Sequence, residues 1–350
     1  MTFHKHVVDT LINRPPELFF GLNARAPFAV PNGYAGALVF LRFVEQQGAR
    51  SAWPGLGPAI ERFEAAMRTE WLPEVAGAPD MEEWRSYPHS PVVGLEALRW
   101  QRARFADENA LPSQTVEAVA ESTGRLELWR GAAGVLQGLV LGGNAPVGLV
   151  AREAAALEAA WLARPESEAF LGLAHGQLGI VCALLNAAIV TGEPVSQAVL
   201  SRLRGLYDAQ QRAGQWQSMM PSLEGSLCNG MTGAALVAAL AYQVTGDASF
   251  EALFSTHLRA AQETAVGPSI CCGTGGMLLL MLVAEKLGLL PAESRDWVKA
   301  RFILLLEQRK QLSSFLGFFS GYCGLAYIDF LLHHPEAPVE FPILMPAQTP

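Results

Sequence analysis

The chain has 350 residues, of which 51% are hydrophobic and 17% charged, and its formal net charge is −8. This composition supplies a large apolar core, and without a Lys/Arg run it argues against nucleic acid and anionic membranes as partners. The longest apolar run, residues 276–284, is far shorter than the roughly 20 residues that span a bilayer, so no membrane span is predicted.

The N-terminus and the cysteines indicate the compartment. The first ten residues lack the apolar stretch and the cleavage site of a secretory signal, so we expect a cytoplasmic protein. Five cysteines, two of them adjacent, make no sensible disulfide framework there. They indicate metal binding, catalysis or core packing instead.

One pattern, Gly-x-x-Gly followed by an apolar run, recurs along the chain. In chain order the copies begin at Gly33, Gly131, Gly176, Gly230, Gly273 and Gly321. The last five begin 43 to 54 residues apart, whereas the first interval is 98 residues, close to two such periods. A period of about 40 to 50 residues is the length of a helix–turn–helix unit. The long first interval is predicted to hold a degenerate hairpin and an irregular cap, over residues 45–110.

Each repeat is predicted to be a helical hairpin. An apolar helix begins at the Gly-x-x-Gly, and a more polar helix, such as residues 151–163 or 294–309, precedes the next copy. The paired glycines leave bare backbone on one face, so neighbouring helices can approach closely. We therefore predict an all-α fold in which six to seven hairpins close into a single α/α toroid over residues 1–350, with the apolar helices inside. Residues 334–350, which include five prolines, are predicted to form an extended tail over the surface.

The residue before each first glycine is of a polar or metal-binding type. In chain order these residues are Asn32, Arg130, His175, Asn229, Cys272 and Ser320. Equivalent positions of a closed ring lie at one height, so the pattern predicts a polar ring that faces a central cavity. Helix capping is the alternative, and it suits the Asn and Ser residues but not Arg130, His175 or Cys272.

Three cysteines fall at matched positions of two consecutive repeats. Cys228 and Cys271 each lie two residues before a first glycine, and Cys272 follows directly. Three thiolates suit one Zn²⁺ ion per chain, and a set of three protein ligands leaves a fourth position open, as in catalytic zinc sites. The alternative is three inert buried cysteines.

The remaining cysteines and histidines are assigned no chemistry. Cys182 and Cys323 are expected in the core. Surface positions are expected for His4, His6, His257, His333 and His334.

Four segments, in this order and spacing, resemble the lanthionine cyclase (LanC-like) family. They are residues 172–179 (GLAHGQLG), 227–233 (LCNGMTG), 270–276 (ICCGTGG) and 320–324 (SGYCG). The resemblance implies a toroid that carries zinc at one end. It also implies an enzyme that adds a cysteine thiolate of a dehydrated precursor peptide to dehydroalanine or dehydrobutyrine, forming a lanthionine or methyllanthionine ring.

The resemblance also implies roles for single residues. Cys228, Cys271 and Cys272 fall on the zinc-ligand positions, and His175 falls on the catalytic histidine. Glu127 falls where the family often has an aspartate. Arg130 is expected to position His175 or the enolate together with Glu127.

The sequence departs from the common family pattern in two informative places. Cys272 replaces the usual histidine ligand, which gives an all-cysteine site and an altered reactivity. Asn229 stands where some relatives have Tyr or His, so proton delivery is expected to rest more heavily on His175.

Three further readings stay open beside a stand-alone cyclase that follows a separate dehydratase or kinase-lyase enzyme. One is the addition of other thiols, such as glutathione, to dehydroamino acids. Another is a catalytically silent zinc- or peptide-binding module of a peptide-modifying complex. The third is an unrelated α/α toroid such as a glycosidase, which would need paired carboxylates in the cavity.

Overall fold

The computed structural model describes residues 2–16, 33–48, 51–70, 114–165, 170–214, 216, 223–312, 315–339, 341–342 and 344–345. These residues form α-helices, one short 3₁₀ helix and no strand, as the repeat pattern predicts. Within them no helix combines the length and the apolar character that crossing a membrane requires.

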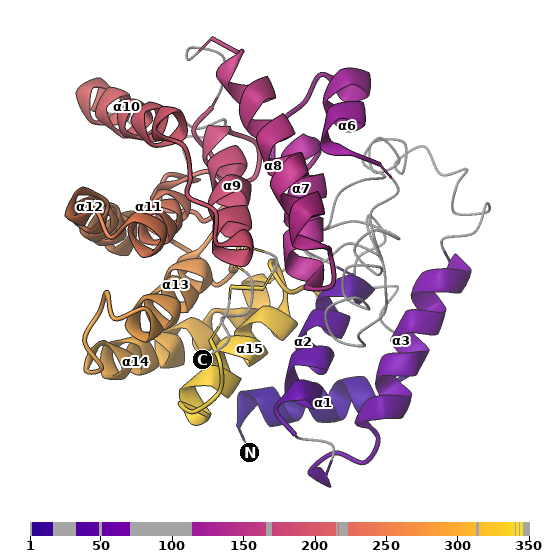
Figure 1. Cartoon of the computed structure of the whole chain (residues 1–350). Helices are drawn as coiled ribbons and strands as arrows, with labels where there is room; N and C mark the ends of the chain where they lie inside the picture. The colour runs from indigo at the N-terminus through magenta and orange to yellow at the C-terminus, as the bar shows by residue number, and fades with distance from the viewer. Residues whose placement is uncertain are drawn as a thin grey trace.

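The helices form two layers around a common centre (Figure 1). The inner helices are α2 (Tyr34–Gln46), α7 (Ala132–Gly142), α9 (Gln177–Thr191), α11 (Met231–Thr245), α13 (Thr274–Lys286) and α15 (Tyr322–His333). The outer helices are α1 (Phe3–Asn13), α3 (Leu56–Glu70), α8 (Val147–Leu162), α10 (Gln197–Ala213), α12 (Ala248–Thr264) and α14 (Ser294–Glu307). The short helices α6 (Val116–Thr123) and η6 (Arg309–Gln311) complete the described set. This is the predicted α/α toroid.

The inner helices are apolar on every side because they are packed on every side. In α9 every residue from Gln177 to Ala187 is buried, and in α13 every residue from Thr274 to Ala284 is buried. The outer helices bury one face only. In α14 the buried residues are Val298, Phe302 and Leu305.

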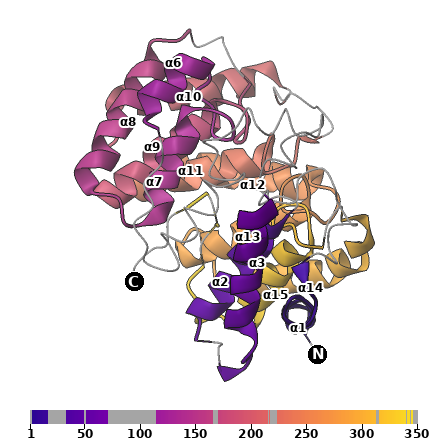
Figure 2. The same cartoon turned by 90° about the vertical axis from the view of Figure 1, so that its right-hand side faces the viewer.

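The first and the last of the described helices meet at one place, which we call the seam. The outer helix α1 packs against the inner helix α15, which is the last helix among the described residues, and α15 also contacts α2 (Figures 1 and 2). The N-terminal helix thus serves as the outer partner of the C-terminal inner helix, and this pairing closes the ring.

Each Gly-x-x-Gly lies where the prediction places it, at the start of an inner helix, but its packing role is broader than predicted. A Cβ on Gly179 would lie 2.1 Å from the carbonyl oxygen of Leu173, in the preceding loop, and 2.7 Å from Cβ of Leu128, in the preceding repeat. Gly233 has the same environment, 2.2 Å from the carbonyl oxygen of Leu227. The second glycine therefore lets the loop fold back over the helix start as well as letting neighbouring repeats approach.

The described part of the C-terminal segment differs from a tail over the surface. Phe341, Leu344 and Met345 are buried, and the carbonyl oxygen of Leu344 accepts a 2.6 Å hydrogen bond from the side chain of Asn186 on α9. Three apolar side chains and a buried amide partner hold this segment in the interior. Most of the predicted 45–110 cap, from residue 71 on, and Asn32 lie outside the described residues, whereas residues 56–70 form α3 of the outer layer.

Candidate functional site

The loops that precede the inner helices are joined to one another by backbone hydrogen bonds. The amide of Trp129 donates to the carbonyl of Ala174, and that of Ala174 to Cys228, at 3.1 and 2.8 Å. The amide of Cys228 donates to Cys271, and that of Cys271 to Phe319, at 3.2 and 2.9 Å. All five residues stand two positions before the first glycine of their repeats. We call this row the loop ladder, and it fixes the relative positions of the side chains that it carries.

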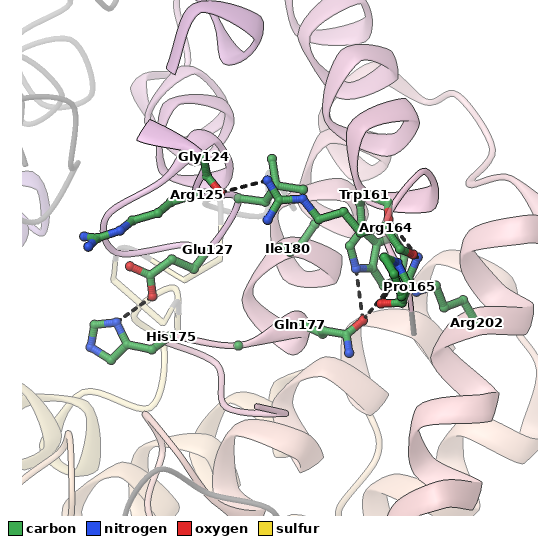
Figure 3. A pocket seen from close by; sticks show the side chains of 12 residues that line it. Gly124, Arg125, Glu127, Trp161, Arg164, Pro165, His175, Gln177, Ile180 and Arg202 are labelled. Carbon is green, nitrogen blue, oxygen red and sulfur yellow. Dashed lines mark hydrogen bonds and ion pairs between the residues drawn. The ribbon is translucent and has the colours of Figure 1, made fainter. Parts of the chain in front are cut away.

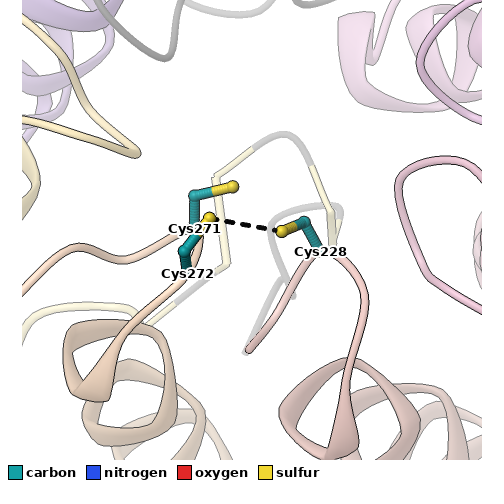
Figure 4. Close-up of side chains that lie close together, drawn as sticks. All are labelled: Cys228, Cys271 and Cys272. Carbon is teal, nitrogen blue, oxygen red and sulfur yellow. Dashed lines mark hydrogen bonds between the residues drawn. The ribbon is translucent and has the colours of Figure 1, made fainter. Parts of the chain in front are cut away.

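Three thiols converge on the loop ladder (Figure 4). The sulfur atoms of Cys228 and Cys272 lie 3.6 Å apart, and those of Cys228, Cys271 and Cys272 all lie within 4.8 Å of one another. Cys228 and Cys271 are 7% and 8% exposed, and Cys272 is partly exposed. Sulfur donors held this closely, with one of them open to solvent, fit the tetrahedral thiolate coordination of zinc.

The three thiols are electrostatically unequal. Hydrogen bonds from Cys271 and Cys272 lower the pKa of Cys228 well below its usual value, and the charge of His175 adds a smaller effect in the same direction. The hydrogen bond to Cys228 raises the pKa of Cys272 to about 12 and raises that of Cys271 well above its usual value. The cluster thus favours ionisation of Cys228 over that of the other two thiols, and a bound cation would favour further ionisation.

Two serines fix the backbone of the thiol loops. The hydroxyl oxygen of Ser226 accepts a hydrogen bond from the main-chain N–H of Asn229. The hydroxyl oxygen of Ser269 accepts one from the main-chain N–H of Cys272, and both are 3.1 Å long. Asn229 is itself buried, and its side-chain nitrogen donates to the Cys228 sulfur at 3.5 Å. Asn229 therefore supports a predicted zinc ligand directly.

His175 is held by a carboxylate on one side and an indole on its face. Its Nδ1 lies 2.6 Å from Oε2 of Glu127, so the carboxylate accepts the Nδ1 proton and Nε2 is left for another partner (Figure 3). The Trp129 ring stacks on the imidazole with centroids 5.6 Å apart and planes at 20°. Arg130 Nε lies 4.0 Å from Oε1 of Glu127. The predicted residues Glu127, Arg130 and His175 are thus brought together.

Two buried polar atoms beside His175 accept or donate no hydrogen bond among the described residues. They are Oε1 of Glu127 and Nε1 of Trp129. Buried polar atoms without a partner are rare in folded proteins and commonly mark a position for water or a ligand. The site therefore offers a bound molecule one acceptor and one donor.

A pocket of about 180 Å³ opens beside His175 (Figure 3). Its lining includes His175, Glu127 and the basic residues Arg125, Arg164 and Arg202. Arg202 is occupied structurally, because its guanidinium donates to the carbonyls of Trp161 and Arg164 at the end of α8.

Trp129 and Phe319 were not among the sequence-predicted site residues. Both occupy the repeat position of Cys228 and Cys271, and their rings lie 6.3 Å apart. Comparing that position across all repeats, and not for cysteines alone, is the signal that finds them. Ser226 and Ser269 share the repeat position of Glu127 and are found by the same comparison.

The other cysteines and histidines divide between core and surface. Cys182 and Cys323 are buried, as expected, and burial raises the pKa of the Cys182 thiol to about 12. The surface prediction is wrong for His4 and His257, which are 1% and 8% exposed. Their rings are covered because α1 and α12 turn them toward α15 and toward Tyr207, respectively.

Comparison with known proteins agrees with this architecture. The family model described as lanthionine synthetase C-like protein matches residues 121–345. Among solved structures, one titled nisin cyclase superposes with a TM-score of 0.68 at 14% identity, over 95% of this chain and 94% of that one. At that identity the likeness concerns the fold alone. The search of curated proteins gave no match. Since the family model covers well over half of the sequence, the chain belongs to the lanthionine synthetase C-like family.

Proposed function

We propose that the protein is a zinc-dependent lanthipeptide cyclase that forms (methyl)lanthionine thioether rings. The observation that carries the proposal is the cluster of Cys228, Cys271 and Cys272 on the same loop ladder as the His175–Glu127 pair. A metal-binding thiol cluster and an oriented proton carrier at one end of a toroid match the two requirements of thiol addition to a dehydroamino acid.

Cys228, Cys271 and Cys272 would hold the zinc ion. When bound, zinc supplies Lewis-acid chemistry that favours the thiolate form of a substrate cysteine at neutral pH. The side chain of Asn229 supports Cys228 through its 3.5 Å contact with the sulfur.

The reaction adds S–H across a C=C bond and needs no oxidant. The substrate sulfur bonds to the β carbon, the π electrons move to the α carbon and its carbonyl oxygen as an enolate, and the α carbon gains a proton. His175 takes up at Nε2 the proton that the substrate thiol loses and delivers it to the α carbon, while Glu127 holds Nδ1 and keeps the ring oriented.

The enolate oxygen requires a hydrogen-bond donor, and the site has one without a partner among the described residues. The Nε1–H of Trp129 is buried beside His175, and we assign it to the carbonyl oxygen on which charge develops. Arg130 positions Glu127, with the pocket beside His175 receiving neighbouring residues of the dehydrated precursor peptide. Such a peptide would come from a separate dehydratase.

Cyclisation of a dehydrated peptide tests the proposal. Ring formation leaves the peptide mass unchanged but consumes its free thiol, so resistance to N-ethylmaleimide, read by mass spectrometry, reports the reaction. We expect zinc-loaded wild type and Cys323→Ala to protect the thiol, and Cys272→Ala and His175→Asn to fail. If the zinc-loaded wild type bound the peptide and left its thiol reactive, a catalytically silent binding module would be the better description.

A further inference from the structure

Three of the chain's seven histidines gather at the seam that closes the ring, at the C-terminal end of α15, whereas the loop ladder lies before the N-terminal end of that helix. His4 lies on α1, His333 is the last residue of α15, and His334 follows it. Asp329, one turn earlier on α15, lies between the first two. His4 and Asp329 are 1% and 4% exposed, whereas the side chain of His333 is 43% exposed. The cluster is therefore buried but open on one side.

Asp329 contacts the Nδ1 atom of both His4 and His333. Its Oδ2 lies 2.7 Å from Nδ1 of His4 and accepts the His4 amide at 2.8 Å. Its main-chain oxygen lies 2.8 Å from Nδ1 of His333. An ionised carboxylate and a carbonyl only accept hydrogen bonds, so each Nδ1 carries a proton, which a metal ion bound at that nitrogen would displace. Nδ1 of His333 also lies 3.4 Å from Oδ1 of Asp329, so the two Nδ1 atoms and the carboxylate face one another.

The spacing of the rings suits a shared ion. The imidazole centroids of His4 and His333 lie 5.5 Å apart. Two imidazoles on one tetrahedral ion, with bonds of about 2.0 Å, have centroids about 5 Å apart. One ligand atom from each of His4, Asp329 and His333 falls within 4.8 Å of the others, and Oδ1 of Asp329 lies on the His333 side. Small rotations bring the three ligands to bonding distance.

We propose that His4, Asp329 and His333 form a second metal site, which binds a divalent transition-metal ion and fastens α1 to α15. Two neutral imidazoles and one carboxylate are ligands that suit Zn²⁺ and related ions. The other nitrogen of His4, Nε2, lies 3.3 Å from Oγ1 of Thr2, a contact that helps to fix the orientation of the ring. The site shares no residue with the thiol cluster, so this proposal can be tested independently of the cyclase proposal.

A metal at this place would act on stability rather than on chemistry. His4 and Asp329 are 325 residues apart in sequence, and their contact holds the ends of the helical order together. An ion that binds only the closed ring shifts the folding equilibrium toward it in proportion to its occupancy.

Metal content of the full chain tests the proposal. We expect wild type to retain about two zinc ions per chain after dialysis, one in the thiolate site and one in the histidine site. His333→Ala and His4→Gln should each retain about one ion, and so should Cys272→Ala. His6→Ala is the matched control, because His6 is exposed on the same helix and should leave both ions in place.

Cobalt substitution identifies which ion is lost. Thiolate-to-cobalt charge-transfer absorption should persist in His333→Ala and vanish in Cys272→Ala, while the latter still binds one cobalt ion. A wild type that binds one ion, with none left in Cys272→Ala, would overturn the second site and leave the cyclase proposal intact. That comparison requires no variant of the histidine cluster to fold.

Discussion

The imidazole of His175 is fixed by two neighbours of different chemistry. Glu127 accepts its Nδ1 proton, and Trp129 covers one face of the ring. If Glu127 sets the tautomer and orientation of the proton carrier, Glu127→Gln should lower kcat by roughly 10²- to 10⁴-fold, the range of general acid–base contributions. Zinc content should not change. The control is Glu121→Gln, an exposed position on α6, and equal rates in the two variants would remove Glu127 from the mechanism.

Trp129 contributes an aromatic ring and an indole N–H, and a substitution by phenylalanine separates these two contributions. Trp129→Phe keeps an aromatic face for His175 but deletes the buried Nε1–H. Loss of one donor to a developing oxyanion costs about 10²- to 10³-fold in kcat. We expect a decrease of that order in the cyclisation assay, with unchanged zinc content. Trp53→Phe removes an indole N–H that bonds Asp9 on the far helix α1, and it should cyclise at the wild-type rate.

His257 makes stability depend on pH. Burial lowers its pKa below 6.5, and its ring packs 5.0 Å from that of Tyr207. Because the folded chain binds this proton less readily than the unfolded chain, the stabilisation is complete above about pH 6.5 and is lost as pH falls through the lower, folded value. As pH falls below about 6.5, the stability of wild type against urea should therefore decrease more than that of His257→Gln. An identical pH slope in the two proteins would exclude this contribution, and His6→Gln serves as the exposed control.

At the scale of the helix, the second glycine of the last four motifs is predicted to be intolerant of any side chain, at Gly179, Gly233, Gly276 and Gly324. Gly179→Ala places a Cβ against the carbonyl of Leu173 and the side chain of Leu128, and overpacking of this kind costs about 1–3 kcal/mol. It should also displace the loop that carries His175 and reduce activity. Gly205→Ala is the matched control. That glycine lies within α10 with nothing near its missing Cβ, so alanine should stabilise by up to about 1 kcal/mol. Chemical denaturation measures both, and a neutral Gly179→Ala would refute the packing argument.

The sequence predicts the hairpins well because each is specified by a local pattern, a Gly-x-x-Gly followed by an apolar run. It also predicts the convergence of Cys228, Cys271 and Cys272, because matched repeat positions must lie side by side in a ring. The stacking of Trp129 on His175 is harder to predict, because a tryptophan before a helix is typical of an ordinary core position. The burial of His4 depends on contact with Asp329, 325 residues away, and no local pattern records such a pairing.

At the scale of the whole molecule, the C-terminal segment contributes to the core. Phe341 is fully buried, and Phe→Ala changes at such positions cost about 3–5 kcal/mol. We expect Phe341→Ala to lower the urea midpoint strongly, and Pro338→Ala, at an exposed position of the same segment, to leave it nearly unchanged. Similar midpoints for the two variants would show that the segment is dispensable for the ring.

The pairing of α1 with α15 also imposes an order of events during synthesis. The ribosome makes α1 roughly 300 residues before its partner α15, an interval of about 15 to 60 s at ordinary rates of translation. The hairpins between them need only short-range contacts and can form as they emerge. Until α15 follows, α1, whose buried residues include Val7, Val8 and Leu11, lacks the helix against which it packs. A nascent chain of this protein is therefore most exposed to aggregation just before its final helix is complete.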